Sequence, residues 1–166
     1  MAEKPRKELD ALDLLMQDHR EVESLFRDFE HLQKKGEATG AVIGNACAEL
    51  RMLDTLENDV FYPAVSKAAD EAEQIEALLD DAEDAHDTVL ELIDELEELE
   101  TDEERNAHFV LVIENVQRHI LEEEAELFPK VQKLKLDLEA LAAEMKVRRG
   151  ELMIEMGLAE VDAEAA

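Results

Sequence analysis

Two stretches of the chain share one pattern, and this repeat constrains the fold more than any other feature. They read L-x-x-x-E-x-x-x-F-Y-P and H-x-x-x-E-x-x-x-L-F-P. Aligning their prolines pairs Glu57 with Glu123, and it pairs Leu53 with His119. The chain therefore contains a duplicated unit, and its two copies differ where Leu53 stands in place of a histidine.

A second pair of segments, D-H-x-x-V-x-x-L and A-H-x-x-V-x-x-L, recurs at nearly the same offset and pairs His19 with His86. The duplicated unit is thus two helices long, and each copy offers a histidine and a glutamate. Interiors of helical bundles hold metals through such side chains on facing helices. The repeat therefore outlines a dinuclear metal site.

The composition indicates one globular helical domain. The chain has 166 residues, 46% of them hydrophobic, with five Gly, three Pro and no Trp. This length allows a sizeable core, and the hydrophobic content argues against wholesale disorder. The net charge of −28 repels nucleic acid and anionic lipid, so neither is an expected partner.

The remaining composition bears on location. The single cysteine, Cys47, excludes an intramolecular disulfide and suits a reducing compartment. No apolar run is long enough to span a membrane, and the basic N-terminus has no apolar stretch behind it. We therefore expect a cytoplasmic protein.

Apolar residues follow helical spacing in four segments. These segments cover residues 9–33, about 41–69, 75–96 and 101–127. Thr101 and Glu104 form a capping-box pattern that opens the fourth, and Pro63 and Pro129 fall where the second and fourth should kink or end.

Short connections between these segments favour antiparallel neighbours. The sequence thus predicts an all-α fold, with residues 1–133 forming an up-down-up-down antiparallel four-helix bundle. A further apolar stripe predicts an additional C-terminal helix over residues 134–158, which is a candidate surface for protein contact or dimerisation. Residues 159–166 are expected to form a disordered tail.

Five polar side chains lie on the otherwise apolar stripes of the four helices. They are His19, Glu57, His86, His119 and Glu123. His119 and Glu123, four residues apart, share one helix face and lie roughly 6 Å apart along the axis. Burying two carboxylates without compensation costs several kcal/mol each, and a cation is the simplest compensation. Imidazole and carboxylate donors suit iron, manganese or zinc, and bridging carboxylates suit a pair of irons.

Several nearby residues leave alternatives open. Glu124 could replace Glu123 as the inward glutamate. Asp54 borders the same face as Glu57 and is either the missing ligand or an exposed helix aspartate. Tyr62 is expected to pack at the bundle end, and Cys47 to act as a small buried hydrophobe. The two other histidines, His31 and His108, are assigned to structure or surface because neither can reach the same metal.

At these motifs the chain resembles the hemerythrin-like, HHE cation-binding domains. The resemblance rests on D-H-R-E-V-E around His19, E-N-D-V-F-Y-P after Glu57, His86, and H-I-L-E-E-E-A-E-L-F-P from His119. It covers roughly residues 9–131. The two aromatic-proline endings with their acidic runs are fairly specific, whereas the Asp-His pair alone is not.

The resemblance implies a four-helix bundle with a non-haem di-iron centre that meets O2 or related small molecules. It gives as ligands the five residues His19, Glu57, His86, His119 and Glu123. The chain departs from the family pattern at Leu53 and at Ala82, where oxygen-carrying members have histidines. These losses argue against reversible oxygen carriage and leave a carboxylate-weighted site with open positions.

Three functions follow as hypotheses. The first is an iron-binding protein that senses, binds or detoxifies O2, peroxide or NO. The second is a di-iron enzyme with peroxide-decomposing or ferroxidase activity. The third is a degenerate bundle that binds no metal and acts by protein contact.

Overall fold

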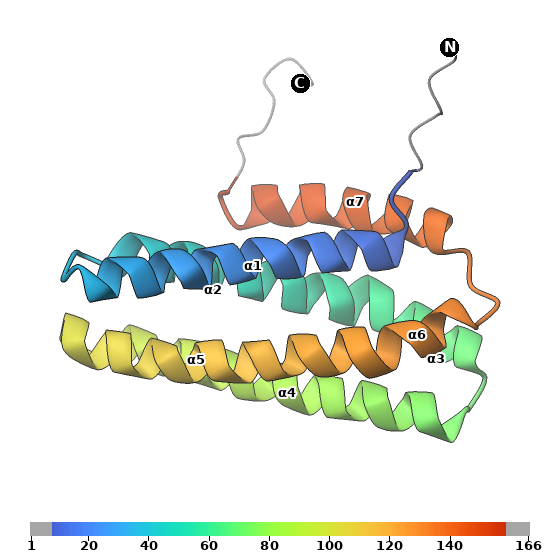
Figure 1. Ribbon diagram of the computed structural model, residues 1–166. Helices are drawn as coiled ribbons and strands as arrows, with labels where there is room; N and C mark the ends of the chain where they lie inside the picture. The colour runs from blue at the N-terminus through green and yellow to red at the C-terminus, as the bar shows by residue number, and fades with distance from the viewer. Residues whose placement is uncertain (1–7, 159–166) are drawn as a thin grey trace, which may run out of the picture.

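The computed structural model describes residues 8–158, and all regular elements in this range are helical (Figure 1). In chain order they are α1 (Ala11–Lys34), α2 (Gly40–Leu56), the π-helical segment η1 (Glu57–Phe61), α3 (Tyr62–Ala69), α4 (Glu73–Glu98), α5 (Asp102–Glu122), a second π-helical segment η2 (Glu123–Leu127), α6 (Phe128–Gln132) and α7 (Leu138–Glu155). The all-helical prediction is confirmed. Within residues 8–158, no helix has both the length and the apolar character needed to cross a membrane.

Side-chain caps fix where two of the long helices begin. Asp10 precedes α1 and accepts a hydrogen bond from the Asp13 backbone N–H at 2.9 Å. The predicted capping box at the start of α5 is present, because Thr101 accepts from the Glu104 N–H at 3.1 Å and Glu104 accepts in return. Such caps satisfy N–H groups that have no partner in the first helical turn.

The long helices lie side by side in two pairs, α1 with α2 and α4 with α5 (Figure 1). α7 packs on the outside of α1 and α2, on the side away from α4 and α5. Two ion pairs fasten it there: Arg149 pairs with the buried Asp18 of α1, and Arg148 pairs with Asp59 of η1 at 3.1 Å. The C-terminal helix predicted over residues 134–158 is therefore present as Leu138–Glu155. The predicted disordered tail, residues 159–166, lies outside the described residues.

The apolar core falls into two clusters along the length of the long helices. One surrounds Phe61 and Phe128 and includes the contact with α7. The other surrounds Phe26, Phe29 and Phe109, whose rings pack edge to face. His19 lies between Leu15 of the first cluster and Val22 of the second, and His86 lies between Ala82 of the first and Val89 of the second. We call the polar side chains at this level the polar layer: His19, Glu57, His86, His119 and Glu123.

Candidate metal centre

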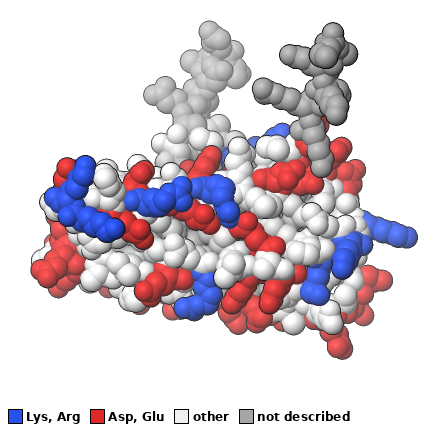
Figure 2. Space-filling model, viewed as in Figure 1, with Lys and Arg blue, Asp and Glu red and all other residues white. Residues whose placement is uncertain are grey.

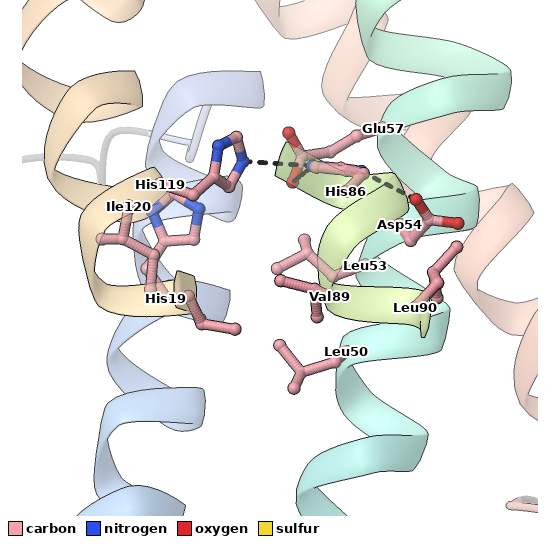
Figure 3. Close-up of a pocket in the computed structure, with 11 residues that line it drawn as sticks. His19, Leu50, Leu53, Asp54, Glu57, His86, Val89, Leu90, His119 and Ile120 are labelled. Carbon is pink, nitrogen blue, oxygen red and sulfur yellow. Dashed lines mark hydrogen bonds and ion pairs between the residues drawn. The ribbon is translucent and has the colours of Figure 1, made fainter. Parts of the chain in front are cut away.

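Four side chains of the polar layer bring their donor atoms together. Glu57, His86, His119 and Glu123 each offer one nitrogen or oxygen, and these four atoms lie within 4.8 Å of one another. They come from four different elements, namely η1, α4, α5 and η2. Figure 3 shows His119 approaching His86 from the opposite side of the interior, and their Nε2 atoms are 3.1 Å apart.

The two glutamates each begin a π-helical segment, which the sequence analysis did not anticipate. The Tyr62 N–H bonds to the carbonyl of Glu57, and the Phe128 N–H bonds to the carbonyl of Glu123, so each turn spans five residues. In both copies a proline stands two residues after the last residue of the π-helical segment. Proline has no N–H and clashes with the carbonyl four residues earlier, so a wider turn relieves the helix at this point. The repeated proline was the signal available in the sequence.

His19 completes the layer from α1. It is fully buried, and its Nε2 lies 3.5 Å from Glu123 Oε1. Its other ring nitrogen, Nδ1, lies 3.2 Å from Glu124 Oε2, and Arg20 also pairs with that carboxylate. Glu123 therefore points inward, while Glu124 holds the outer nitrogen of His19. A hydrogen bond of this kind fixes which nitrogen carries the proton and leaves Nε2 free as a ligand.

An acidic residue on α2, Asp54, orients His86 in the same way. Its Nδ1 lies 2.7 Å from Asp54 Oδ1, and Asn58 donates to the same oxygen at 2.9 Å. Its Nε2 faces the cluster of donors (Figure 3). Asp54 was expected to be either a ligand or an exposed aspartate. The structure places it behind His86, where it orients the ring. It is not among the clustered donor atoms.

Tyr62 also reaches the centre, in contrast to the packing role expected from the sequence. Its hydroxyl donates to Glu123 Oε2 at 2.6 Å and lies 3.1 Å from His86 Nε2. The repeat explains why the Tyr62 ring lies beside a histidine, because the aligned residue of the second copy does the same. Phe128 aligns with Tyr62 and stacks on His19, with ring centroids 6.0 Å apart, while the rings of Tyr62 and His86 are 5.5 Å apart. Only the first copy carries a hydroxyl.

The layer holds polar atoms that the protein itself does not satisfy. Among the described residues, the buried atoms without a hydrogen-bond partner are His19 Nε2, both carboxylate oxygens of Glu57, and Glu123 Oε1. All of them belong to the proposed ligand residues. An unpaired buried carboxylate is costly, and natural proteins keep one where a cation or another partner binds. The donor set therefore fits a metal ion.

The electrostatics of the two glutamates differ. Burial raises the pKa of Glu57 well above its ordinary value, and the charge of Glu123 raises it further. Burial acts in the same direction on Glu123, but its contacts with His119 and His19 outweigh burial and hold its pKa well below the ordinary value. Burial opposes protonation of His19, yet Glu123 and Glu124 together raise its pKa. The raised pKa values of His19 and Glu57 both favour bound protons, which lower the net negative charge of the metal-free centre.

A model of the hemerythrin HHE cation-binding domain matches residues 10–131. The chain belongs to the hemerythrin HHE family. No match was found among curated proteins or among solved structures. The family match ends before α7, so the C-terminal helix lies outside the matched region.

Leu53 and Ala82, the two positions where the resemblance led us to expect histidines, border different cavities. Leu53 lines a cavity of about 30 Å³ together with His19, Glu57, His86 and His119. Figure 3 shows Leu53 pointing into the space between these side chains. Its remaining walls are formed by Asp54 and by five apolar side chains, namely Leu50, Val89, Leu90, Val116 and Ile120. Ala82 is buried and lines a separate cavity of about 140 Å³ that ends on His119 and Glu123.

The other residues considered from the sequence lie away from the centre. His108 bonds to the Leu92 carbonyl at 3.0 Å and pairs with Glu95, and His31 is exposed on α1. Cys47 is half-buried on α2, where burial raises the pKa of its thiol to about 11.

Proposed function

We propose that this protein binds iron in its polar layer and uses it to bind, sense or detoxify O2, peroxide or NO. The residues that would hold the metal are His19, Glu57, His86, His119 and Glu123. One observation carries the proposal. Buried donor atoms from two glutamates and a histidine have no hydrogen-bond partner among the described residues, and they lie in the layer where the other histidines converge.

The carboxylate of Glu123 supports a pair of ions over a single one. Its Oε1 lies 3.5 Å from His19 Nε2, while its Oε2 lies 3.0 Å from His119 Nε2. The two oxygens therefore face different histidines. Glu123 would thus offer one oxygen toward each histidine, which suits a site for two ions. We also propose that the four long helices form a single up-down-up-down bundle around this layer, which the course of the chain in Figure 1 supports.

When bound, iron would supply Lewis-acid and redox chemistry toward small oxidants. The chain's own residues would prepare the site for it. Asp54 and Glu124 hold the outer nitrogens of His86 and His19, so that Nε2 of each ring faces inward. The Leu53 cavity, at about 30 Å³, exceeds the space that one water requires and could admit a diatomic molecule. Its apolar walls would exclude bulk water and larger solutes.

A second candidate function, decomposition of peroxide, is favoured by Tyr62. Its hydroxyl lies within hydrogen-bond distance of Glu123 and His86, where it can deliver or accept a proton. The replacement of two family histidines by Leu53 and Ala82 also leaves fewer protein ligands. Fewer protein ligands would leave room for an exogenous one.

The test is element-specific metal analysis of freshly purified protein, followed by anaerobic titration with ferrous iron. We expect close to two iron ions per chain in wild type and a clear loss in His119→Ala. His108→Ala is the matched control, because His108 bonds to a backbone carbonyl far from the layer. Peroxide consumption by the loaded protein, with the same two variants, tests the second function. Wild-type protein that binds no iron would refute both.

A further inference from the structure

The larger of the two cavities next to the centre has an acidic lining. It lies between α4 and the end of α5 with η2, and its volume is about 140 Å³. Asp81 contributes from α4, Glu122 from α5 and Glu126 from η2, and all three residues are exposed. Its lining includes neither lysine nor arginine. We call these three residues the acidic mouth.

The inner end of this cavity is the centre itself. His119 and Glu123 line it, and both belong to the clustered donors. Glu123 is 3% exposed, and its Oε1 has no hydrogen-bond partner among the described residues. The cavity therefore joins an acidic surface to a buried carboxylate of which one oxygen lacks a hydrogen-bond partner. Ala82 keeps the passage open, since a larger side chain there would extend into it.

Charge and hydration distinguish this cavity from the one beside Leu53. A divalent cation sheds its water reluctantly and exchanges it most readily for carboxylate oxygens. The Leu53 cavity is smaller, and besides residues of the centre its lining holds one acidic side chain, Asp54, which is already bonded to His86 and Asn58. Figure 2 shows acidic side chains, with some basic ones among them, along the lower part of the face. Carboxylates around a concave mouth concentrate cations and speed their capture.

We propose that the acidic mouth and the cavity beneath it are the port through which a divalent cation enters the centre. Asp81, Glu122 and Glu126 hold the ion in transit, and His119 and Glu123 receive it. The inference rests on the proposed metal-binding function, but it concerns residues that are not ligands of the final site. Its signature is therefore a change in the rate of metal uptake at constant stoichiometry.

The experiment is stopped-flow uptake of Co²⁺ by the metal-free full chain, followed through the visible absorption of bound cobalt. The port variant is Asp81→Asn/Glu122→Gln/Glu126→Gln. The control, Asp28→Asn/Glu98→Gln/Glu114→Gln, removes the same number and kinds of charge from exposed positions away from the cavity. The association rate constant of the port variant should fall on the order of tenfold at low salt, with the difference shrinking as salt rises. The control should stay within about twofold of wild type.

Two results would overturn the port. One is equal uptake rates in the port variant and the control. The other is a changed stoichiometry or cobalt spectrum in the port variant, which would make these residues ligands of the centre. Wild type that takes up no cobalt at all would instead refute the metal site itself, so the two failures are distinguishable.

A second variant tests the port by narrowing the cavity instead of removing charge. Ala82→Leu should slow uptake at every salt concentration, because the added side chain fills the cavity. Ala143→Leu, at an exposed position on α7, is its control. Uptake by Ala82→Leu at the wild-type rate would contradict the port. If circular dichroism shows that Ala82→Leu does not fold, the charge variants decide the question alone.

Discussion

Glu57→Gln should stabilise the metal-free protein while weakening its hold on metal. Glu57 is completely buried, neither of its carboxylate oxygens has a hydrogen-bond partner among the described residues, and burial raises its pKa well above the ordinary value. Replacing it by the neutral amide of the same shape removes a group that must either carry a buried charge or take up a proton. The Glu57 carboxylate destabilises the metal-free protein, and a bound cation would remove this cost.

The magnitude follows from proton linkage. An unfolded glutamate has a pKa of about 4.3, so keeping Glu57 protonated at pH 7 costs at most about 3.7 kcal/mol, at 1.36 kcal/mol per pH unit. The buried glutamine amide needs partners of its own, which offsets about 1–3 kcal/mol of this gain. We expect a net stabilisation of about 2 kcal/mol. For a chain of this length that corresponds to roughly 4–8 °C in melting temperature.

The pH dependence of this stability difference provides an internal check. Because the folded-state pKa of Glu57 lies above the unfolded value, the folded protein binds the extra proton. Its contribution to stability is complete below pH of about 4.3 and is lost as pH rises toward the folded-state pKa. The melting temperature of Glu57→Gln should therefore exceed that of wild type by an increasing margin as pH rises from about 4.3 to 7.

The assay is thermal unfolding of both proteins with chelator and, anaerobically, with ferrous iron. Iron at a hundredfold its Kd should stabilise wild type by about 2.7 kcal/mol and the variant by less, so the margin between the two melting temperatures should narrow, and their order should reverse if the variant gains less than about 0.7 kcal/mol. Glu114→Gln, at an exposed position on α5, should leave the melting temperature unchanged in both conditions. If Glu57→Gln destabilises the metal-free protein and iron leaves wild-type melting unchanged, the carboxylate has a structural role and the reasoning is refuted.

Four further predictions concern single positions. Leu53→His should raise metal affinity and shift the optical spectrum of the iron-loaded protein, because Leu53 faces the donors; unchanged binding and spectra would contradict this. Tyr62→Phe should slow peroxide consumption while leaving iron stoichiometry intact, since it removes only the hydroxyl; equal rates would remove that role. Arg149→Ala should destabilise the fold by about 1–3 kcal/mol in denaturant titrations, because it leaves the buried Asp18 unpaired, and Arg149→Lys should recover part of this loss. Alkylation of Cys47 in the native protein should stay slow at pH 8 and accelerate toward pH 11, because burial raises its pKa to about 11; fast reaction at pH 8 would show an accessible thiolate.

The sequence determined the helices and most of the donor set. Apolar spacing located the helical segments, and a Thr101–Glu104 capping box located the start of α5. The repeat placed Glu57 and Glu123 on the inner faces of their helices, and both are buried. These features are readable from sequence because helical periodicity and capping depend on residues only a few positions apart.

The tertiary structure decided what each polar side chain faces. Asp54 and Glu124 are both acidic and both adjoin the centre, yet one orients His86 and the other orients His19. Tyr62 directly follows the π-helical segment η1, and its hydroxyl donates to Glu123, which lies on a different helix. The acidic mouth joins residues of α4 to residues of α5 and η2, which no periodicity relates. Local spacing fixes which face of a helix a residue occupies, whereas the partner across that face is set by how the helices pack, and packing depends on the whole chain at once.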